Sequence, residues 1–200
     1  MIFVEISIKL LKRMIIGVCG YQAAGKDTVA LYLKDRYGFF HYSLSEVLRE
    51  ILRKEGKEIN RDTLTFYGNS LREKQGADFL AREVLKNLQR PAVITSIRNL
   101  AELKRLEKEA DFLAVFVEAS AKLRYARAMA RNREGEAQLS LAEFIKKEKR
   151  EEGEKNTGQQ LHLLKNRCKV ILDNSGGKEE LFSQIDQLLG KLRNKDGAKL

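Results

Sequence analysis

The sequence predicts an α/β fold, in which one sheet of five parallel strands is covered by helices on both faces. Two observations support this prediction. Short apolar runs alternate along the chain with helical patterns, and several of these runs are apolar at every position, as strands of a buried parallel sheet are. No repeat and no linker divides the 200 residues, a length that suits one domain. The expected strands are residues 14–19, 39–42, 92–96, 112–117 and 170–173.

The first strand runs into the stretch Gly20-Tyr-Gln-Ala-Ala-Gly25-Lys26-Asp27-Thr28, and a helical pattern follows over residues 26–36. Strand, G-x-x-x-x-G-K and helix in this order are the context of a phosphate-binding loop. The glycines let successive N–H groups point into one cavity, and the helix N-terminus adds its positive dipole end. We therefore expect a nucleotide's phosphates to bind at Gly20, Ala23, Ala24, Gly25, Lys26, Asp27 and Thr28.

Asp27 departs from the usual loop pattern, which has Ser or Thr directly after the lysine as a hydroxyl ligand for Mg²⁺. In this chain Thr28 comes one position later. We expect Asp27 and Thr28 to be the metal ligands. The alternative is a glycine-containing turn that binds nothing, and the strand before the loop and the helix after it argue against that alternative.

Charge favours a small anionic partner. The chain has 38 Lys and Arg against 28 Asp and Glu, which gives a net charge of +10. Such an excess fits either nucleotide phosphates or nucleic acid. Nucleic-acid surfaces combine basic with exposed aromatic side chains, and this chain has 8% aromatic residues and no Trp. A nucleotide is therefore the partner that we expect, and nucleic acid is not.

Cysteine usage indicates a cytoplasmic protein with reduced thiols. Cys19 and Cys168 are far apart, and each lies in or beside an apolar run. With no C-x-x-C pair and two histidines, a structural zinc site is not expected. No apolar run approaches the ~20 residues of a membrane span, so no membrane association is expected.

We expect residues 14–192 to form one domain. Residues 1–13 would be an N-terminal extension, because they resemble no signal peptide, and residues 193–200 a polar tail. Between the second and third strands, residues 43–88 are largely helical. An insertion of this length exceeds a simple crossover connection, and we expect it to bind the second substrate.

Helix starts are marked by small polar residues. Ser43 and Glu46 fit a capping box at the start of the insertion. Further helices are expected after Asn60, after Asp78, over residues 99–109, after Ser120, after Ser140 and around residues 181–189.

Arginines follow three of the expected strands at their carboxyl ends. Arg49 lies just beyond the second strand and Arg98 directly after the third. Arg124, Arg127 and Arg131 follow the fourth strand at spacings that place them on one helix face. Because ligands of such sheets bind at the carboxyl ends of the strands, these side chains are expected near the phosphate loop.

With these features, residues 14–190 resemble the nucleoside monophosphate kinase group of P-loop NTPases, which includes adenylate kinases, their archaeal and bacterial relatives and dephospho-coenzyme A kinases. Ser43-Leu-Ser-Glu-Val-Leu-Arg49 is similar to the Ser-Thr-Gly-Asp-Met-Leu-Arg segment of adenylate kinases. Ile94-Thr-Ser-Ile-Arg98 is similar to their Asp-Gly-Phe-Pro-Arg segment. The Gly-Lys-Asp-Thr sequence resembles the loops of some deoxynucleotide monophosphate kinases.

The resemblance implies a three-layer α/β/α kinase fold with a short lid-like segment at residues 124–138. It also implies that Arg49 and Arg98 hold the acceptor's phosphate, together with Ser43, and we add Arg72 because it lies in the insertion. The expected catalytic residues are Lys26, Arg98, Arg124 and Arg127, since phosphoryl transfer depends on positioning and on positive charge.

One departure from the family concerns the metal. The family usually places an Asp at the end of the third strand, where it holds the water shell of Mg²⁺. In this chain Thr95 or Ser96 stands there. Asp27 could restore a carboxylate near the metal from the side of the loop.

The sequence therefore predicts an ATP- and Mg²⁺-dependent kinase of a small acceptor, most simply a nucleoside or deoxynucleoside monophosphate. A monophosphate is already anionic and needs no general base. A hydroxyl acceptor such as dephospho-coenzyme A would need a carboxylate near the second strand, where Glu46 and Glu50 lie.

A regulatory nucleotide-binding protein with little turnover is the other alternative. A GTPase is disfavoured because no N-K-x-D motif occurs. The acceptor's identity and the oligomeric state stay open.

Overall fold

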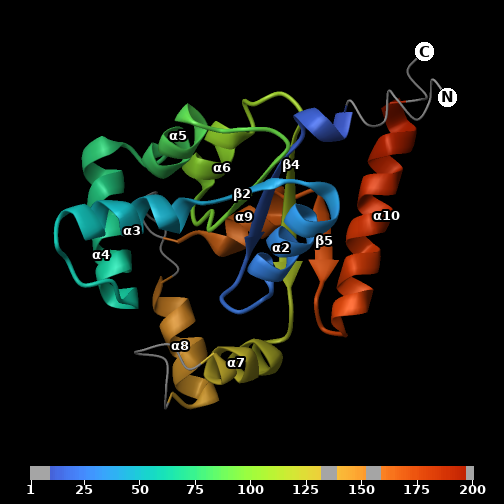
Figure 1. The fold of residues 1–200 in the computed structure, drawn as a ribbon. Coiled ribbons are helices and arrows are strands. Elements are labelled where there is room, and N and C mark those ends of the chain that lie inside the picture. Colours follow the sequence, from blue (N-terminus) through green and yellow to red (C-terminus); the bar gives the residue numbers. More distant parts are fainter. Residues whose placement is uncertain (1–9, 132–138, 152–158, 197–200) are drawn as a thin grey trace.

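The computed structural model describes residues 10–131, 139–151 and 159–196. Its centre is one five-stranded sheet in the order β2-β3-β1-β4-β5, and every neighbouring pair in it is parallel (Figure 1). The five-stranded parallel sheet expected from the sequence is therefore confirmed. The strands are β1 (Ile15–Gly20), β2 (Phe40–Ser43), β3 (Ala92–Thr95), β4 (Phe112–Glu118) and β5 (Val170–Asp173).

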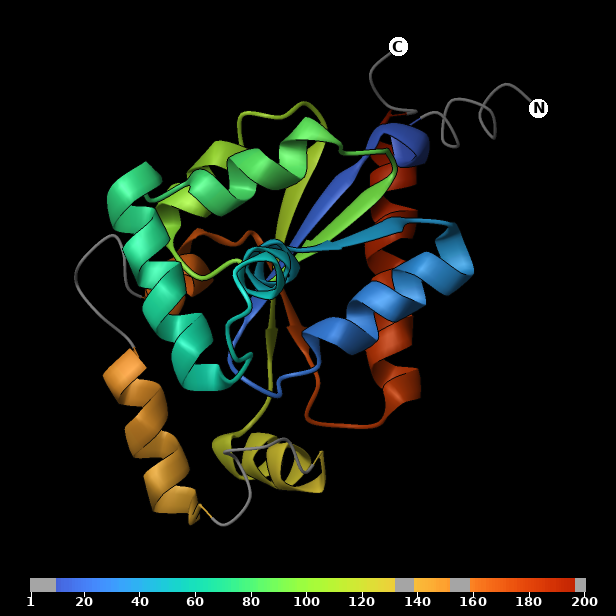
Figure 2. The ribbon, with the colours of Figure 1, turned by 60° about the vertical axis from the view of Figure 1, so that its left-hand side comes forward.

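Helices cover both faces of this sheet, which gives the expected three layers. One face is covered by α2 (Lys26–Tyr37) and α10 (Lys178–Asp196). The helices α3 (Leu44–Lys54), α5 (Phe79–Lys86), α6 (Leu100–Leu106) and α9 (Leu161–Arg167) contribute to the core on the other face. Farther out lie α4 (Arg61–Gln75), α7 (Ala121–Ala130) and α8 (Leu141–Glu151), and α7 and α8 lie beyond the carboxyl end of β4 (Figure 2). None of the helices in the described ranges has the length and apolar character needed to cross a bilayer.

The central strand β1 is apolar throughout because it has a core on each side. Ile15 and Cys19 belong to the core shared with α5 and α6, whereas Ile16 and Val18 belong to the core shared with α2 and α10. All six residues of the strand are buried. Burial of each large aliphatic side chain stabilises the fold by about 1.5–3 kcal/mol, so β1 anchors the loop that follows it.

The two thiols lie in the same core. Cys19 and Cys168 are both free and buried, as expected. A hydrogen bond with Cys168, together with burial, raises the pKa of the Cys19 thiol well above its usual value. Both effects favour the protonated thiol.

The insertion between β2 and β3 consists of α3, α4 and α5, in agreement with the helical pattern of residues 43–88. Helix α4 begins at a capping box. The Thr63 N–H donates to Asn60 Oδ1 over 2.9 Å, and the Asn60 N–H donates to Thr63 Oγ1 over 3.0 Å. The helix start expected at Asn60 is thus confirmed.

The capping box expected from Ser43 and Glu46 is wrong. The Ser43 side chain makes no capping hydrogen bond to α3, and its hydroxyl bonds to Ser45 and Ser96 instead. Helix α3 nevertheless begins at Leu44, because its apolar face, with Leu44 and Leu48, is buried in the core.

The structure differs from the sequence prediction at both ends of the domain. Residues 10–13 are helical, and Leu10 and Leu11 pack against the core of α2 and α10, so part of the expected extension belongs to the fold. Helix α10 continues to Asp196, past the expected start of the tail at residue 193.

Sequence reasoning missed α9 and made α6 too long. Helix α9 has seven residues, and its N-cap Gln160 makes no side-chain capping bond. Two turns are too short to show a helical repeat of apolar residues, and no Ser, Thr, Asp or Asn stands directly before them as an N-cap. Both usual sequence signals of a helix are therefore missing. Helix α6 was expected to reach residue 109 and ends at Leu106.

A buried ion pair connects the insertion to α6. Arg72 of α4 donates from Nε and Nη2 to one carboxylate oxygen of Glu102, over 3.0 and 2.9 Å. The two side chains are 7% and 0% exposed. The other oxygen of Glu102 accepts the backbone N–H groups of Arg98 and Asn99, over 2.8 and 3.3 Å. Arg72 is therefore bonded to a buried carboxylate of the scaffold, and it supports the turn after β3 rather than an exposed binding surface.

We predict that Arg72→Met lowers the free energy of unfolding by about 3–5 kcal/mol, because it leaves the Glu102 carboxylate buried without its partner. Urea denaturation would measure the loss. The control is Arg105→Met, which breaks a half-buried pair with Glu109 at 3.5 Å and should cost no more than about 1 kcal/mol. Equal losses in the two variants would contradict this account.

Candidate functional site

The phosphate loop (residues 20–28) lies between β1 and α2, and its backbone takes unusual conformations at three positions. Gly20, Ala23 and Gly25 have positive φ angles of 147°, 56° and 106°. A Cβ at Gly20 would lie 2.3 Å from the carbonyl oxygen of Val117 on β4, so a side chain is excluded there. Turns between right-handed and left-handed backbone direct successive N–H groups to one side and form an anion-binding concavity.

Asn174, just after β5, supports the loop from outside. Its Nδ2 donates to the carbonyl oxygen of Ala24 over 2.8 Å, and its own N–H donates to the carbonyl oxygen of Glu118 over 2.8 Å. A Cβ at Gly25 would lie 2.1 Å from Asn174 Nδ2. Gly25 is thus required both by its left-handed backbone and by this contact.

Lys26 lies over the loop. Its Nζ donates to the carbonyl oxygens of Gly20 and Tyr21, over 2.9 and 2.7 Å. Burial, and next the positive charge of Arg98, lower the pKa of Lys26 to about 7, and Arg131 acts in the same direction. Arg98 follows β3 and Arg131 follows α7, so the cations that act on Lys26 come from two different parts of the chain.

The expected metal ligands lie at the start of α2. Asp27 is exposed in the first turn and Thr28 is half-buried. Thr95, at the position where the family has an acid, is fully buried, and its hydroxyl lies 2.9 Å from Nε2 of His41. Within the described ranges no three His, Cys, Asp or Glu side chains are grouped as metal ligands. These residues fit a Mg²⁺ ion that is held mainly by phosphate oxygens, with one carboxylate and one hydroxyl from the chain.

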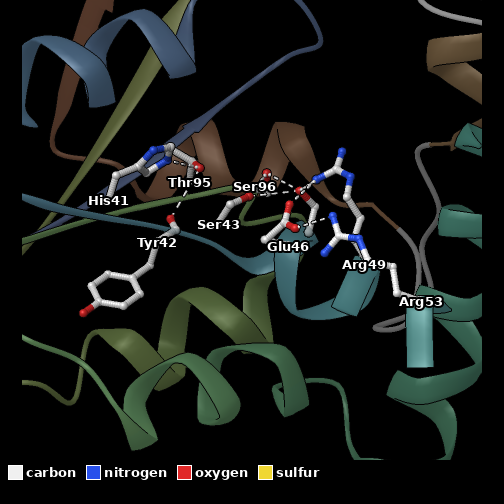
Figure 3. Close-up of polar contacts among 9 residues, drawn as sticks. His41, Tyr42, Ser43, Glu46, Arg49, Arg53, Thr95 and Ser96 are labelled. Atoms are coloured by element: carbon white, nitrogen blue, oxygen red, sulfur yellow. Dashed lines mark hydrogen bonds and ion pairs between the residues drawn. The ribbon is translucent and has the colours of Figure 1, made fainter. Parts of the chain in front are cut away.

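Three serine hydroxyls meet where β2 and β3 end (Figure 3). Ser43 lies 2.9 Å from Ser45 and 3.0 Å from Ser96, and Ser45 lies 3.2 Å from Ser96. Arg49 Nη1 donates to the Ser45 hydroxyl over 2.9 Å. This serine triangle, formed by Ser43, Ser45 and Ser96, presents hydroxyls and a guanidinium together, which are groups that bind phosphate oxygens.

Sequence reasoning placed Ser43 and Arg49 at this site but missed Ser45 and the role of Ser96. Ser45 lies in the same motif as both predicted residues, so the motif itself carried the signal. Ser96 has a positive φ angle of 63°. Only the folded backbone shows that this conformation brings its hydroxyl toward β2.

Glu46, in the first turn of α3, is bonded to two arginines. Arg53 Nη2 lies 2.7 Å from Glu46 Oε1, and Arg49 Nη1 lies 3.4 Å from Glu46 Oε2 (Figure 3). Each of the two carboxylate oxygens of Glu46 therefore has a guanidinium partner.

The remaining predicted arginines differ in their surroundings. Arg127 Nη2 donates to the carbonyl oxygen of Asn174 over 2.9 Å, and its Nη1 is buried with no hydrogen-bond partner among the described residues. Arg98 Nη1 donates to the side-chain oxygen of Gln159 over 2.8 Å. Arg124 is buried and paired with Glu148 of α8. Arg124 also donates to the carbonyl oxygen of Gln22, so it lies beside the loop although it has a carboxylate partner. In the lid-like segment expected at residues 124–138, residues 124–130 belong to α7, and residues 132–138 lie outside the described ranges.

A family model described as an AAA domain matches residues 16–162, which include the phosphate loop, the serine triangle and α8. The chain is a member of the AAA domain family. The match covers four of the five strands and both groups of predicted site residues.

Two archaeal proteins are similar to the chain over most of its length. A UPF0200/UPF0201 protein of Archaeoglobus fulgidus is 26% identical over 191 residues, which are 92% of this chain and 57% of that protein. The chain thus spans little more than half of this relative. A UPF0200 protein of Sulfurisphaera tokodaii is 28% identical over 180 residues, which are 89% of this chain and 97% of that protein.

Solved structures of kinases share the fold of this AAA domain protein. A shikimate kinase from Aquifex aeolicus superposes with a TM-score of 0.57 at 16% identity, over 89% of this chain and 97% of its own. A gluconokinase from Sinorhizobium meliloti superposes with a TM-score of 0.51 at 15% identity, over 92% and 98%. A Thermus thermophilus protein, TT1252, reaches 0.58 at 23% identity, over 90% and 97%. The chain therefore has the fold of P-loop kinases.

Gly25→Ala should destabilise the protein more than Gly38→Ala. Both positions have positive φ angles, 106° and 70°, but a Cβ at Gly38 meets nothing within 4 Å. The left-handed backbone alone costs about 1–2 kcal/mol, and only Gly25→Ala adds the collision with Asn174. Chemical denaturation of each variant measures the difference.

The matched test is Gly25→Ala in an Asn174→Ala background. Removing the Asn174 amide relieves the collision, so the further loss caused by Gly25→Ala should fall toward that of Gly38→Ala. An unchanged loss in this background would show that the contact with Asn174 is not what requires glycine.

Proposed function

We propose that this protein is an ATP-dependent phosphotransferase of the nucleoside or deoxynucleoside monophosphate kinase type. One observation carries the proposal: the phosphate loop after β1 and the serine triangle with Arg49 lie at the carboxyl ends of neighbouring parallel strands of one sheet. In a parallel α/β sheet this edge is where ligands bind. Two phosphate-binding arrangements at one edge suit a reaction with a phosphate donor and a phosphorylated acceptor.

On the donor side, the loop backbone and Lys26 would hold the β- and γ-phosphates of ATP. Lys26 would then exchange its bonds to the carbonyls of Gly20 and Tyr21 for bonds to phosphate oxygens. Arg127 would approach the phosphates from the side of Asn174, since its Nη1 is buried without a partner among the described residues. Arg124, predicted to neutralise the transferring group directly, has its guanidinium bonded to Glu148, and we give it a positioning role instead.

On the acceptor side, Arg49 and the serine triangle would bind the monophosphate, and Arg98 would orient it toward the donor. The carboxylate near the triangle, Glu46, is held by Arg49 and Arg53. Because each of its two oxygens already has a guanidinium partner, Glu46 is not placed to activate a hydroxyl acceptor. A monophosphate needs no such activation because its oxygen is already anionic.

For the metal, we propose that Asp27 and Thr28 contact Mg²⁺ together with the phosphates of ATP. When bound, Mg²⁺ neutralises charge on the β- and γ-phosphates and orients them. The Asp27 carboxylate would thus replace the one that is missing at Thr95, where the family usually has an Asp.

Two alternatives remain for the same site. A hydroxyl acceptor is suggested by the shikimate kinase and gluconokinase among the structural relatives, and would include a dephospho-coenzyme A-like substrate. A regulatory nucleotide-binding protein with little turnover is suggested by Thr95. We also propose that the protein is cytoplasmic, as its cysteine usage predicts.

The deciding experiment is an acceptor panel. The protein is incubated with ATP, Mg²⁺ and, in turn, ribonucleoside and deoxynucleoside monophosphates, shikimate, gluconate and dephospho-coenzyme A, and ADP is measured. We expect ADP to form with a monophosphate. ADP that forms only with a hydroxyl acceptor would support the first alternative, and ATP binding without acceptor-dependent ADP would support the second.

Arg49→Ala should raise KM for the accepted monophosphate by about 10- to 100-fold, because a hydrogen bond to a charged group contributes about 1.5–3 kcal/mol. The KM for ATP should change little. The matched control is Arg53→Ala, which removes a neighbouring arginine that bonds to Glu46. A similar rise in both variants would mean that Arg49 acts through the charge of α3 and not through direct contact.

The lowered pKa of Lys26 predicts that ATP binding takes up protons above pH 7. The free protein has a Lys26 pKa of about 7, so at pH 8 most of this amine is neutral. Bound phosphates favour the ammonium and raise its pKa. Uptake should approach one proton per ATP, and affinity should fall between pH 7 and pH 9.

Calorimetry in two buffers of different ionisation enthalpy measures this uptake. Arg98→Gln removes a positive charge that lowers the pKa of Lys26. Its free protein should keep Lys26 more protonated, so proton uptake at pH 8 should be smaller. Binding of ATP to the unaltered protein at pH 8 without proton uptake would contradict the assignment.

A further inference from the structure

Helix α8 contacts the phosphate loop although it does not cover a face of the sheet. Phe144 of α8 packs in a small apolar cluster with Ala128 of α7 and Ala23 of the loop. At its other side, Lys147 lies 3.5 Å from Asp62 in the first turn of α4. Helix α8 therefore lies between α7, on the donor side, and the helical insertion, on the acceptor side (Figure 2).

Glu148 of α8 reaches the phosphate loop through Arg124. The two side chains form a two-point ion pair, and Arg124 Nη2 lies 2.9 Å from Glu148 Oε2. The guanidinium also donates to the carbonyl oxygen of Gln22 over 3.4 Å and lies 4.8 Å from the ring centroid of Tyr21. Because Arg124 is 6% exposed, its position is set by these contacts.

Glu151, one turn farther along α8, reaches Arg98 through Gln159. Gln159 Nε2 donates to Glu151 Oε2 over 3.0 Å, and Gln159 Oε1 accepts from Arg98 Nη1 over 2.8 Å. This orientation of the amide is the one in which a donor faces the carboxylate and an acceptor faces the guanidinium.

The backbone fixes the same connection. The Gln160 N–H donates to the carbonyl oxygen of Arg98 over 2.8 Å, and Gln160 Oε1 accepts the N–H of Leu100 over 3.0 Å. The end of β3 is thus bonded to the residues that follow α8 by main-chain and side-chain hydrogen bonds. Gln159, whose N–H also donates to the carbonyl oxygen of Glu151 over 3.3 Å, connects the end of α8 to the Arg98 side chain.

We propose that α8 couples the two substrate sites: Glu148 positions the phosphate loop through Arg124, and Glu151 positions Arg98 through Gln159. This inference rests on the proposed function, because it assigns the loop to the donor and Arg98 to the acceptor. Glu148 and Gln159 are positioning residues, since they touch neither substrate. When an acceptor phosphate draws Arg98, the displacement reaches the loop through one rigid helix, and ATP affinity changes. By linkage, ATP changes acceptor affinity by the same factor.

The first test measures affinity for the non-hydrolysable β,γ-imido analogue of ATP by calorimetry, with and without AMP, GMP, CMP, UMP or dTMP supplied in turn. In the unaltered protein, the accepted monophosphate should change analogue affinity by about 5-fold or more. Glu148→Gln and Gln159→Ala should each reduce this factor to below about 2-fold.

The matched control is Glu143→Gln, which removes a carboxylate from the first turn of α8. Glu143 bonds to Ser140 at the start of the helix, and Gln preserves such a capping contact. Coupling should persist in this variant. Coupling that is retained in Glu148→Gln and Gln159→Ala would overturn the proposal.

A second measurement needs no substrate. Glu148→Gln should increase hydrogen exchange of the backbone amides in the phosphate loop by several fold, whereas Gln159→Ala should not. Loop exchange that is unchanged in Glu148→Gln would overturn the link through Arg124. If the analogue or every monophosphate fails to bind, the proposed function fails, and the exchange measurement still decides whether α8 supports the loop.

Discussion

The contact between Asn174 and the backbone of the phosphate loop is the constraint on which the site depends. Asn174 lies 150 residues from Ala24, to whose carbonyl it donates, and it leaves no space for a side chain at Gly25. Its own N–H is bonded to Glu118 on β4. The loop conformation is therefore not a local property of its glycines alone. It requires β4 to lie beside β1 and β5 to lie beside β4, so the strand order and the phosphate loop support each other.

The phosphate loop also lies near several positive charges at this edge of the sheet. Lys26 is half-buried, and desolvation together with the positive charges of Arg98 and Arg131 lowers its pKa to about 7. Like charges held close together in a site of low polarity cost free energy that a solvated surface would not impose. A bound polyanion removes that cost because each cation then has an opposite charge beside it. The arrangement is thus organised for phosphates before any phosphate arrives, which is the form of electrostatic stabilisation that phosphoryl transfer needs.

Local signals predicted the strands and the phosphate loop, because each depends on residues that are adjacent in the sequence. The predictions failed where the deciding partner is distant. Ser43 has the sequence of a helix cap, but its hydroxyl finds Ser96, 53 residues away. Arg72 has the position of an acceptor ligand, but Glu102 binds it from α6. No spacing rule identifies such partners, since the turn after β3 brings them together only in the folded chain. For α9 the reason is different: it is short and has no capping signal.

The group that each arginine bonds to distinguishes structural arginines from candidate phosphate ligands. Its position at the end of a strand distinguishes them less well. Arg72 and Arg124 are each buried and bonded to a carboxylate, and replacing that carboxylate by a phosphate would leave a buried negative charge unpaired, at a cost of several kcal/mol. Arg127 instead donates to a carbonyl oxygen. Exchanging this neutral carbonyl for a phosphate oxygen leaves no charge unpaired and adds the attraction between opposite charges. By this criterion, in the function that we propose, Arg124 would transmit the position of α8 to the loop, and Arg127 would be the arginine of α7 that meets the transferring phosphate.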